Sequence, residues 1–181
     1  LDLAAGTLDV SREILRQNPG LKVLSMDFSR AMLCRGKEKV TRQPDIFPVQ
    51  ADGRLLPLPN ACVDTVTIAF GIRNILPRAD AYREILRVLA PGGRLCILEF
   101  GTGQARIWQG LYNFYLGTVL PRVGQFFSKN PEAYQYLADT ILAFPNASVL
   151  AAELRDAGFA QTGYQALSSG IVYLHVAQKP F

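Results

Sequence analysis

The residues best suited to ligand chemistry lie at the start of the chain, where Leu1 to Asp9 read as a strand, a turn and a helix start. Gly6 lets the backbone of this turn approach a ligand closely, and ligands of open α/β sheets bind outside the carboxyl ends of the strands. Asp27 ends the next expected strand about 20 residues later, where an acidic side chain can accept hydrogen bonds from both hydroxyls of a ribose. Because Gly6 stands alone and the pattern G-x-G-x-x-G is absent, we do not expect the turn to cradle a phosphate.

A further acidic residue, Asp52, follows the third expected strand and is succeeded by Gly53. Its carboxylate or the backbone beside it can meet the edge of an adenine. Each position also has an ordinary structural explanation. The first turn can be a plain connection, Asp27 can cap the helix that starts near Ser29, and Asp-Gly is a common turn dipeptide. Only their combination favours a nucleoside-like ligand at one edge of a sheet.

The elements that must position these residues follow the alternation expected of a parallel sheet. Short apolar segments alternate with longer amphipathic ones, which is typical of parallel strands joined by crossover helices. Ser29 can cap the second helix, and Ile85 and Leu89 recur at helical spacing in the third until Pro91-Gly92-Gly93 stops it. We predict strands at 1–4, 22–26, 47–50, 63–69 and 94–100, and helices at 9–17, 29–40 and 78–89.

The alternation lapses over residues 104–145, which we interpret as a helical, aromatic-rich insertion. Its aromatic side chains can form an ordinary hydrophobic core or an apolar cap over a ligand site. The order resumes with a helix at 147–157 and a closing hairpin of strands at 164–167 and 171–178. Because no repeat or flexible linker interrupts the chain, we predict one domain over 1–181 with an inserted cap.

The composition favours a globular protein and argues against a nucleic-acid partner. Hydrophobic residues make up 49% and charged residues 19% of the 181 residues, which is enough apolar material for a compact fold. The net charge of +4 is spread from Arg12 to Lys179 rather than gathered in one run, so we expect no nucleic-acid binding. A few basic side chains can still add weak attraction to an anionic membrane surface.

The cysteines and the apolar segments carry no motif for a metal site or a membrane span. Cys34, Cys62 and Cys96 lie far apart and form no Cys-x-x-Cys pair, so we predict no bound metal. Pro121 interrupts the most apolar stretch, and no charged leader opens the chain, which predicts a cytoplasmic protein. Because the chain starts on Leu1 at what reads as a strand end, we expect an N-terminal segment to be missing.

Several segments give the sequence a specific family likeness. They are the first turn with Asp27, FGIRN at 70–74, LAPGGRL at 89–95, LPRVG at 120–124, AYQYLA at 133–138 and SGIVYLH at 169–175. On these segments the chain resembles the ubiquinone/menaquinone biosynthesis C-methyltransferase family, which includes demethylmenaquinone methyltransferases. Pro-Gly-Gly turns are common among methyltransferases, whereas FGIRN and the tyrosine-rich insertion are particular to this family. The likeness runs through nearly the whole chain.

The resemblance implies a Rossmann-like class I fold dependent on S-adenosylmethionine, with a seven-stranded, mostly parallel α/β sheet and an antiparallel last strand. The implied cofactor-binding residues, including the glycine of the first turn, are Gly6, Thr7, Asp27, Asp52, Gly53 and Ala69. Ala5 and Leu8 depart from the family, which often has glycine at both positions, and Ala69 stands where it can carry serine. We expect Leu8 either to crowd the cofactor or to need a backbone angle that leucine disfavours.

The resemblance also implies the reaction, methylation of a ring carbon of demethylmenaquinol or of 2-polyprenyl-6-methoxy-1,4-benzoquinol, with both acceptors left open. Arg73 and Asn74 match positions that face the reacting ring. A guanidinium is a poor base because it stays protonated, so we assign Arg73 to stabilise the developing phenolate, with a surface ion pair as the alternative. His175 is the only histidine, and its role as a base or a structural residue stays open.

Two other functions stay open on the sequence. One is a non-catalytic quinone-binding or assembly subunit that retains the fold, motivated by Ala5, Leu8 and Ala69. The other is a methyltransferase for another small lipophilic acceptor. The expected partner is a polyprenyl quinol, and we also consider peripheral membrane contact and a homo-oligomer.

Overall fold

The computed structural model describes residues 1–101, 136 and 139–181, and their strands form one seven-stranded sheet. The strands are β1 (Asp2–Leu3), β2 (Val23–Asp27), β3 (Ile46–Gln50), β4 (Val63–Ala69), β5 (Leu89–Phe100), β6 (Ala160–Leu167) and β7 (Val172–Gln178). Their order across the sheet is β3-β2-β1-β4-β5-β7-β6. Strands β1 to β5 pair in parallel, whereas β7 runs antiparallel to both β5 and β6. The predicted seven-stranded sheet with an antiparallel last strand is confirmed.

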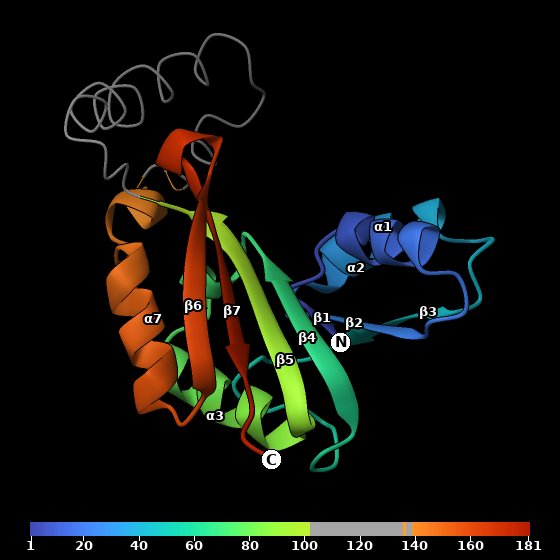
Figure 1. Cartoon of the computed structure of the whole chain (residues 1–181). Helices are drawn as coiled ribbons and strands as arrows, with labels where there is room; N and C mark the ends of the chain where they lie inside the picture. The colour runs from blue at the N-terminus through green and yellow to red at the C-terminus, as the bar shows by residue number, and fades with distance from the viewer. Residues whose placement is uncertain (102–135, 137–138) are drawn as a thin grey trace, which may run out of the picture.

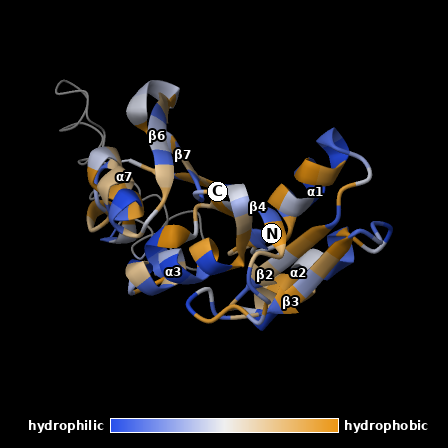
Figure 2. Ribbon diagram, turned by 60° about the horizontal axis from the view of Figure 1, so that its bottom comes forward, coloured by the Kyte–Doolittle hydropathy of each residue, from blue (hydrophilic) through white to orange (hydrophobic). Residues whose placement is uncertain are grey.

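The described helices cover the two halves of this sheet. They are α1 (Asp9–Gln17), α2 (Arg30–Lys39), α3 (Arg78–Val88) and α7 (Ala147–Asp156), with short 3₁₀ turns η1 (Ile72–Asn74) and η3 (Ser168–Gly170). Figure 1 shows α1 and α2 beside the half formed by β1, β2 and β3, and α3 and α7 against the half formed by β4 to β7. The helices carry both hydrophilic and hydrophobic stretches (Figure 2), as expected of helices that pack one face on a sheet.

Side-chain caps define where two of the helices begin. The Ser29 hydroxyl accepts a hydrogen bond from the backbone N–H of Met32 at 3.4 Å, which confirms the predicted cap of α2. The Asn146 side chain accepts from the N–H of Val149 at 3.0 Å and caps α7 in the same way. Each cap satisfies a backbone donor that the first helical turn leaves unpaired.

The segment Pro91-Gly92-Gly93 does not lie between a helix and a strand, as the sequence predicts, but inside β5. Helix α3 ends at Val88, and Leu89 is already extended and pairs with Val63 of β4. The next paired residues are Thr65 and Arg94, so the register shifts there. The proline and glycines are therefore accommodated as an irregularity of β5, where Gly92 adopts a φ of +73°.

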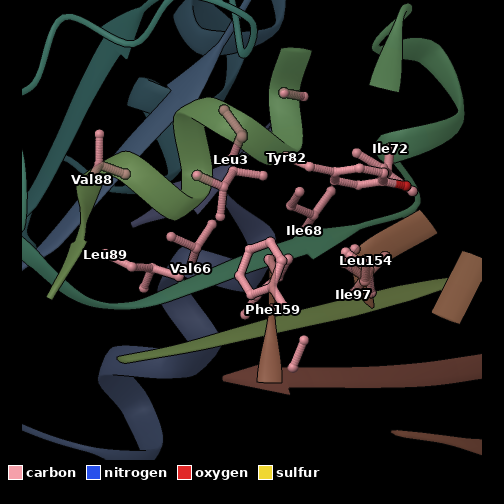
Figure 3. Close-up of a cluster of buried hydrophobic side chains, with 14 of the residues drawn as sticks. Leu3, Val66, Ile68, Ile72, Tyr82, Val88, Leu89, Ile97, Leu154 and Phe159 are labelled. Atoms are coloured by element: carbon pink, nitrogen blue, oxygen red, sulfur yellow. The ribbon is translucent and has the colours of Figure 1, made fainter. Parts of the chain in front are cut away.

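The main hydrophobic core lies between β4, β5 and the helices α3 and α7. Figure 3 shows part of it, in which Val66 and Ile68 of β4 gather with Tyr82 of α3 and Leu154 of α7. All four side chains are at most 1% exposed. Burying a side chain of this size contributes about 1.5–3 kcal/mol, so this cluster fixes the strands whose carboxyl ends form the site.

Most of the expected insertion, residues 104–145, lies outside the described residues. Tyr136 is described, and residues 139–142 are helical. No helix within the described part of the chain is long and apolar enough to cross a membrane.

Candidate cofactor and acceptor site

A cleft of about 600 Å³ opens at the carboxyl ends of β1 to β4. Its wall includes every residue that the sequence analysis assigns to the cofactor: Gly6, Thr7, Asp27, Asp52, Gly53 and Ala69. These residues come from the turns or ends of four different strands and are brought together only by the sheet topology. The position agrees with the general rule that open α/β sheets bind ligands beyond the carboxyl ends of their strands.

The Asp27 carboxylate ties the first turn to the end of β2. Its Oδ2 accepts a hydrogen bond from the N–H of Gly6 at 2.8 Å, and its Oδ1 accepts from the N–H of Ser29 at 2.7 Å. Gly6 has a φ of +52°, a conformation that glycine adopts without steric cost. The carboxylate therefore both shapes the turn and faces the cleft, and each of its oxygens keeps a further lone pair for a ligand.

The Leu8 side chain does not face the cleft. It is fully buried in a small hydrophobic cluster between α1 and α2, with Leu33, Val40 and Ile46. Its backbone adopts φ +64° and ψ +21°, the left-handed region, at the N-terminus of α1. The expectation that Leu8 crowds the cofactor is wrong, and the alternative, a backbone angle that leucine disfavours, is confirmed.

Two glycines, Gly36 and Gly71, pack closely against the first turn. A Cβ at Gly36 of α2 would approach Leu8 Cγ to 2.6 Å and the carbonyl carbon of Thr7 to 2.9 Å. A Cβ at Gly71, which follows β4, would collide with the Cβ of Ala4. Both glycines therefore allow close packing against the turn, which gives the glycine of the FGIRN segment a structural reason. Ala5 needs no such help because its φ is not positive.

Polar side chains on the cleft wall bind one another through an ion pair and a hydrogen bond. The Asp52 carboxylate binds Arg54 through Nη2 at 2.6 Å and Nε at 3.0 Å, and Arg54 Nη1 reaches the carbonyl of Leu76 at 2.7 Å. Hydrogen bonding by Arg54 lowers the pKa of Asp52. The Thr7 hydroxyl donates to Asp9 at 2.6 Å. Asp52 thus presents an ionised carboxylate beside the cleft, and a ligand must share it with Arg54.

The two residues expected at the acceptor ring lie differently. Asn74 lines the cleft, and its Oδ1 accepts a hydrogen bond from the Tyr136 hydroxyl at 2.9 Å. Arg73 is not part of the cleft wall, and its side chain is only 9% exposed. Its Nη1 lies 2.6 Å from Glu99 Oε1. The pair that Arg73 makes is therefore a buried one rather than the surface ion pair considered as the alternative.

His175 lies away from this cleft, in β7. It is 2% exposed, and its Nε2 is 3.1 Å from the carbonyl oxygen of Ala147. Burial lowers the pKa of its imidazole, which favours the neutral ring. Its surroundings fit the structural alternative.

The profile of the ubiE/COQ5 methyltransferase family matches residues 1–179. The chain belongs to the ubiE/COQ5 methyltransferase family. The family resemblance seen in the sequence is thereby confirmed, as is the prediction that the chain is a methyltransferase.

Relatives of the ubiE/COQ5 chain carry names from quinone biosynthesis. It is 40% identical over 187 residues to the ubiquinone/menaquinone biosynthesis C-methyltransferase of Geobacter sulfurreducens, covering 99% of this chain and 71% of the relative. It is 44% identical over 180 residues to the demethylmenaquinone methyltransferase of Paenarthrobacter aurescens, covering 99% of this chain and 69% of the relative.

Solved structures match the ubiE/COQ5 chain in fold at low identity. Phosphoethanolamine N-methyltransferase 2 of Haemonchus contortus, in complex with S-adenosyl-L-methionine, superposes with a TM-score of 0.73 at 15% identity, over 99% of this chain and 48% of that one. A SAM-dependent methyltransferase from Aquifex aeolicus gives 0.70 at 17% identity, over 98% and 80%. The predicted class I methyltransferase fold is confirmed.

Sequence reasoning missed two residues of this region. Glu99 is a charged residue in β5 that follows the buried Leu95 and Ile97 at every second position. Strand alternation therefore puts its side chain on the same inward face. Arg54 gave no such signal, because a polar residue after an Asp-Gly turn is unremarkable. No cluster of metal-ligating side chains occurs among the described residues.

Proposed function

We propose that this ubiE/COQ5 chain transfers the methyl group of S-adenosylmethionine to a ring carbon of a polyprenylated quinol. The observation that carries the proposal is the convergence of Gly6, Asp27 and Asp52 on one cleft in a chain of a methyltransferase family. The name of one relative, a demethylmenaquinone methyltransferase, supports demethylmenaquinol as the acceptor. The other relative is named for both ubiquinone and menaquinone biosynthesis, so we keep 2-polyprenyl-6-methoxy-1,4-benzoquinol as the second candidate.

The cleft residues fit a nucleoside-containing cofactor. Asp27 retains acceptor capacity on both oxygens for the two ribose hydroxyls, and such charge-assisted hydrogen bonds are short and strong. Phe28 lines the same cleft and is 72% exposed, so it offers a free aromatic face to an adenine ring. Asp52 and Gly53 line the same cleft. When bound, S-adenosylmethionine supplies an electrophilic methyl group on a sulfonium.

The acceptor residues follow β4, next to the same cleft. A quinol carbon becomes nucleophilic when the neighbouring hydroxyl ionises, so the site must favour a phenolate. We assign Asn74 to orient the hydroxyl and Arg73 to stabilise the developing negative charge. A guanidinium suits this electrostatic task because it presents several donors in a fixed plane and does not lose its proton.

The proposed function is tested by single-turnover methyl transfer from labelled S-adenosylmethionine to a short-tailed demethylnaphthoquinol kept reduced. We expect a C-methylated product whose formation needs both the cofactor and the reduced ring. A short-tailed benzoquinol in a parallel reaction identifies the preferred acceptor. Wild-type protein that binds the cofactor yet methylates neither quinol would refute the proposed acceptor class.

Arg73→Lys is the variant that tests the catalytic assignment. We expect turnover to fall by about 10²–10³, because an ammonium cannot reproduce the planar donors of a guanidinium. Cofactor affinity should stay within about twofold, since Arg73 is not part of the cleft wall. Turnover near that of the wild type would contradict the assignment and leave the cofactor site intact.

The non-catalytic alternative depends on whether the cofactor binds at all. Leu8, one of its motives, leaves the cleft open because its side chain lies between α1 and α2. Ala69 does line the cleft and supplies no hydroxyl. Calorimetry with S-adenosylmethionine decides between the two: micromolar binding supports the enzyme, and no binding by full-length protein supports a subunit that only retains the fold.

The proposed acceptor carries a membrane-soluble tail, so we also propose peripheral contact with the cytoplasmic face of a membrane. Phe28, Leu55 and Leu76 are 72%, 76% and 56% exposed and lie at or near the cleft. Sedimentation with neutral and anionic vesicles tests this contact. Leu55→Ser, outside the cleft wall, should reduce binding, and light scattering of the same samples measures whether a homo-oligomer forms.

A further inference from the structure

Glu99 is a buried acid at the carboxyl end of β5 that the reaction as described so far leaves unused. Its side chain is 1% exposed. Its Oε1 accepts hydrogen bonds from Arg73 Nη1 at 2.6 Å and from the N–H of Phe100 at 3.0 Å. Its Oε2 is buried and has no hydrogen-bond partner within the described residues. Burying a carboxylate costs free energy unless it is paired, so the ion pair with Arg73 is what allows Glu99 to occupy this position.

The Arg73 guanidinium is anchored through two of its three nitrogens. Nη1 donates to Glu99 Oε1 and to the carbonyl of Phe70, both at 2.6 Å, and Nε donates to Thr140 Oγ1 at 3.3 Å. The guanidinium carbon lies 5.7 Å from the centre of the Phe100 ring. Nη2 makes no hydrogen bond to any residue in the described part of the chain. Two nitrogens are therefore held in place, and the two donors on Nη2 are left for another group.

The anchored guanidinium lies next to the cleft without forming part of its wall. Arg73 belongs to the short turn η1, whose last residue, Asn74, lines the cleft. Phe70 directly follows β4 and Glu99 lies at the end of β5, so the guanidinium is tied to the ends of two adjacent strands of the sheet. Both side chains of the ion pair are at least nine-tenths buried, which removes the solvent screening that makes exposed ion pairs loose.

We propose that Glu99 is a positioning residue for methyl transfer: it holds Arg73 so that the Nη2 donors are presented to the oxygen of the acceptor ring. This inference rests on the proposed function, because it names the group that makes Arg73 effective. The carboxylate also balances the buried positive charge of the guanidinium, which would otherwise seek solvent. Glu99 acts only through Arg73 and does not touch the acceptor.

The variants that test this proposal are Glu99→Gln, Glu99→Asp, Arg73→Lys and the double variant Arg73→Lys/Glu99→Gln. Glutamine keeps an oxygen that can accept from Nη1 but removes the charge, whereas aspartate keeps the charge and withdraws it by one methylene. The measurements are the single-turnover rate with a short-tailed demethylnaphthoquinol and the dissociation constant of S-adenosylmethionine by calorimetry.

We expect Glu99→Gln to lower the single-turnover rate by about 10–100-fold, the usual effect of removing a group that orients a functional side chain. The cofactor dissociation constant should change by less than about twofold. Because Glu99 acts through Arg73, the double variant should be no more than about threefold slower than Arg73→Lys alone. A merely structural role would not produce this non-additivity.

Glu153 provides a control, since it forms a less buried arginine–glutamate ion pair away from the cleft. Its Oε1 lies 2.7 Å from Arg78 Nη2, and the pair joins α3 to α7. Glu153→Gln should lower the melting temperature and leave the single-turnover rate within about twofold of the wild type. This variant separates loss of stability from loss of positioning.

The proposal is overturned if folded Glu99→Gln keeps its rate within about threefold of the wild type. It is also overturned if the rate losses of the two single variants multiply in the double variant, because Glu99 would then act independently of Arg73. If the glutamine variant does not fold, Glu99→Asp is judged by the same criteria. Absence of turnover by the wild-type protein refutes the proposed function itself and this inference with it.

Discussion

Replacing Leu8 with glycine is expected to destabilise the fold while leaving cofactor affinity unchanged. The resemblance to a family that often has glycine here suggested the opposite, tighter binding of the cofactor. The structure places the Leu8 side chain in the α1–α2 cluster, fully buried and outside the cleft wall. Two opposing effects on the free energy of unfolding then decide the outcome.

The first effect is the loss of a buried side chain, and the second is the relief of backbone strain. Truncating a buried leucine to alanine costs about 2.7–5 kcal/mol. A non-glycine residue in the left-handed region costs about 1–2 kcal/mol, which Leu8→Gly would recover at its φ of +64°. Glycine also loses about 0.5–1 kcal/mol through the greater freedom of the unfolded chain. Because packing outweighs strain, we expect a net loss of about 2–3 kcal/mol.

Urea unfolding of Leu8→Gly and Leu8→Ala, with calorimetry of cofactor binding, checks this reasoning. Alanine keeps the strained backbone and loses the side chain, so it should be no more stable than glycine, the reverse of their usual order. Gly36→Ala should destabilise the wild type, because its Cβ would meet Leu8 Cγ at 2.6 Å, and should cost less in the Leu8→Gly background. A Leu8→Gly protein that is more stable, or that binds the cofactor tenfold more tightly, would refute the placement of this side chain.

Three further predictions concern individual polar groups. Asp27→Ala should weaken binding of S-adenosylmethionine by about 10–100-fold, since the ribose hydroxyls lose a charged acceptor and Gly6 loses its tie to β2; unchanged affinity by calorimetry would remove Asp27 from the site. Arg54→Ala should change that affinity by less than about fivefold, because its pair with Asp52 is partly exposed to solvent. A larger loss would show that Arg54 itself binds the cofactor. Burial lowers the pKa of His175, so the folded protein binds a proton on this imidazole less readily than the unfolded chain does. The free energy of unfolding should therefore fall as the pH drops from about 7 to 5. Urea titrations of His175→Gln should show a smaller fall, and a pH dependence identical to that of the wild type would contradict this prediction.

The sequence predicted most of the fold because local patterns and global topology agree in this chain. Helix α1 was predicted at its observed bounds, and β4 likewise, since apolar periodicity and flanking turn residues mark both. The predicted start of β5 was wrong because proline and glycine normally end an element, and only the pairing of Leu89 with Val63 of β4 shows that the strand begins before residue 94. A register irregularity of that kind depends on a neighbouring strand and leaves no local signal.

The convergence of the candidate cofactor residues on one cleft was predictable for a similar reason, whereas the surroundings of Leu8 and Arg73 were not. A carboxylate at a strand end beside a glycine turn has few alternative uses, and the cleft wall contains both Gly6 and Asp27. The direction of the Leu8 side chain depends on its positive φ and on the space left by Gly36, neither of which a single sequence reveals. The partner of Arg73 is 26 residues away in another strand, so nothing in its own segment indicated a buried pair.

The strand β6 has a consequence for how copies of this chain can associate. It forms one open edge of the sheet, and most of its residues are exposed. Unpaired edge strands readily recruit a strand from another molecule, which leads to aggregation or domain swapping. Here the register breaks between Ala160 and Gly163, and Gln161 adopts a φ of +46°, so the backbone near one end of the edge is bent out of the regular ladder. Such a bend works against continuous strand addition, so the regular part of this edge is limited to residues 163–167.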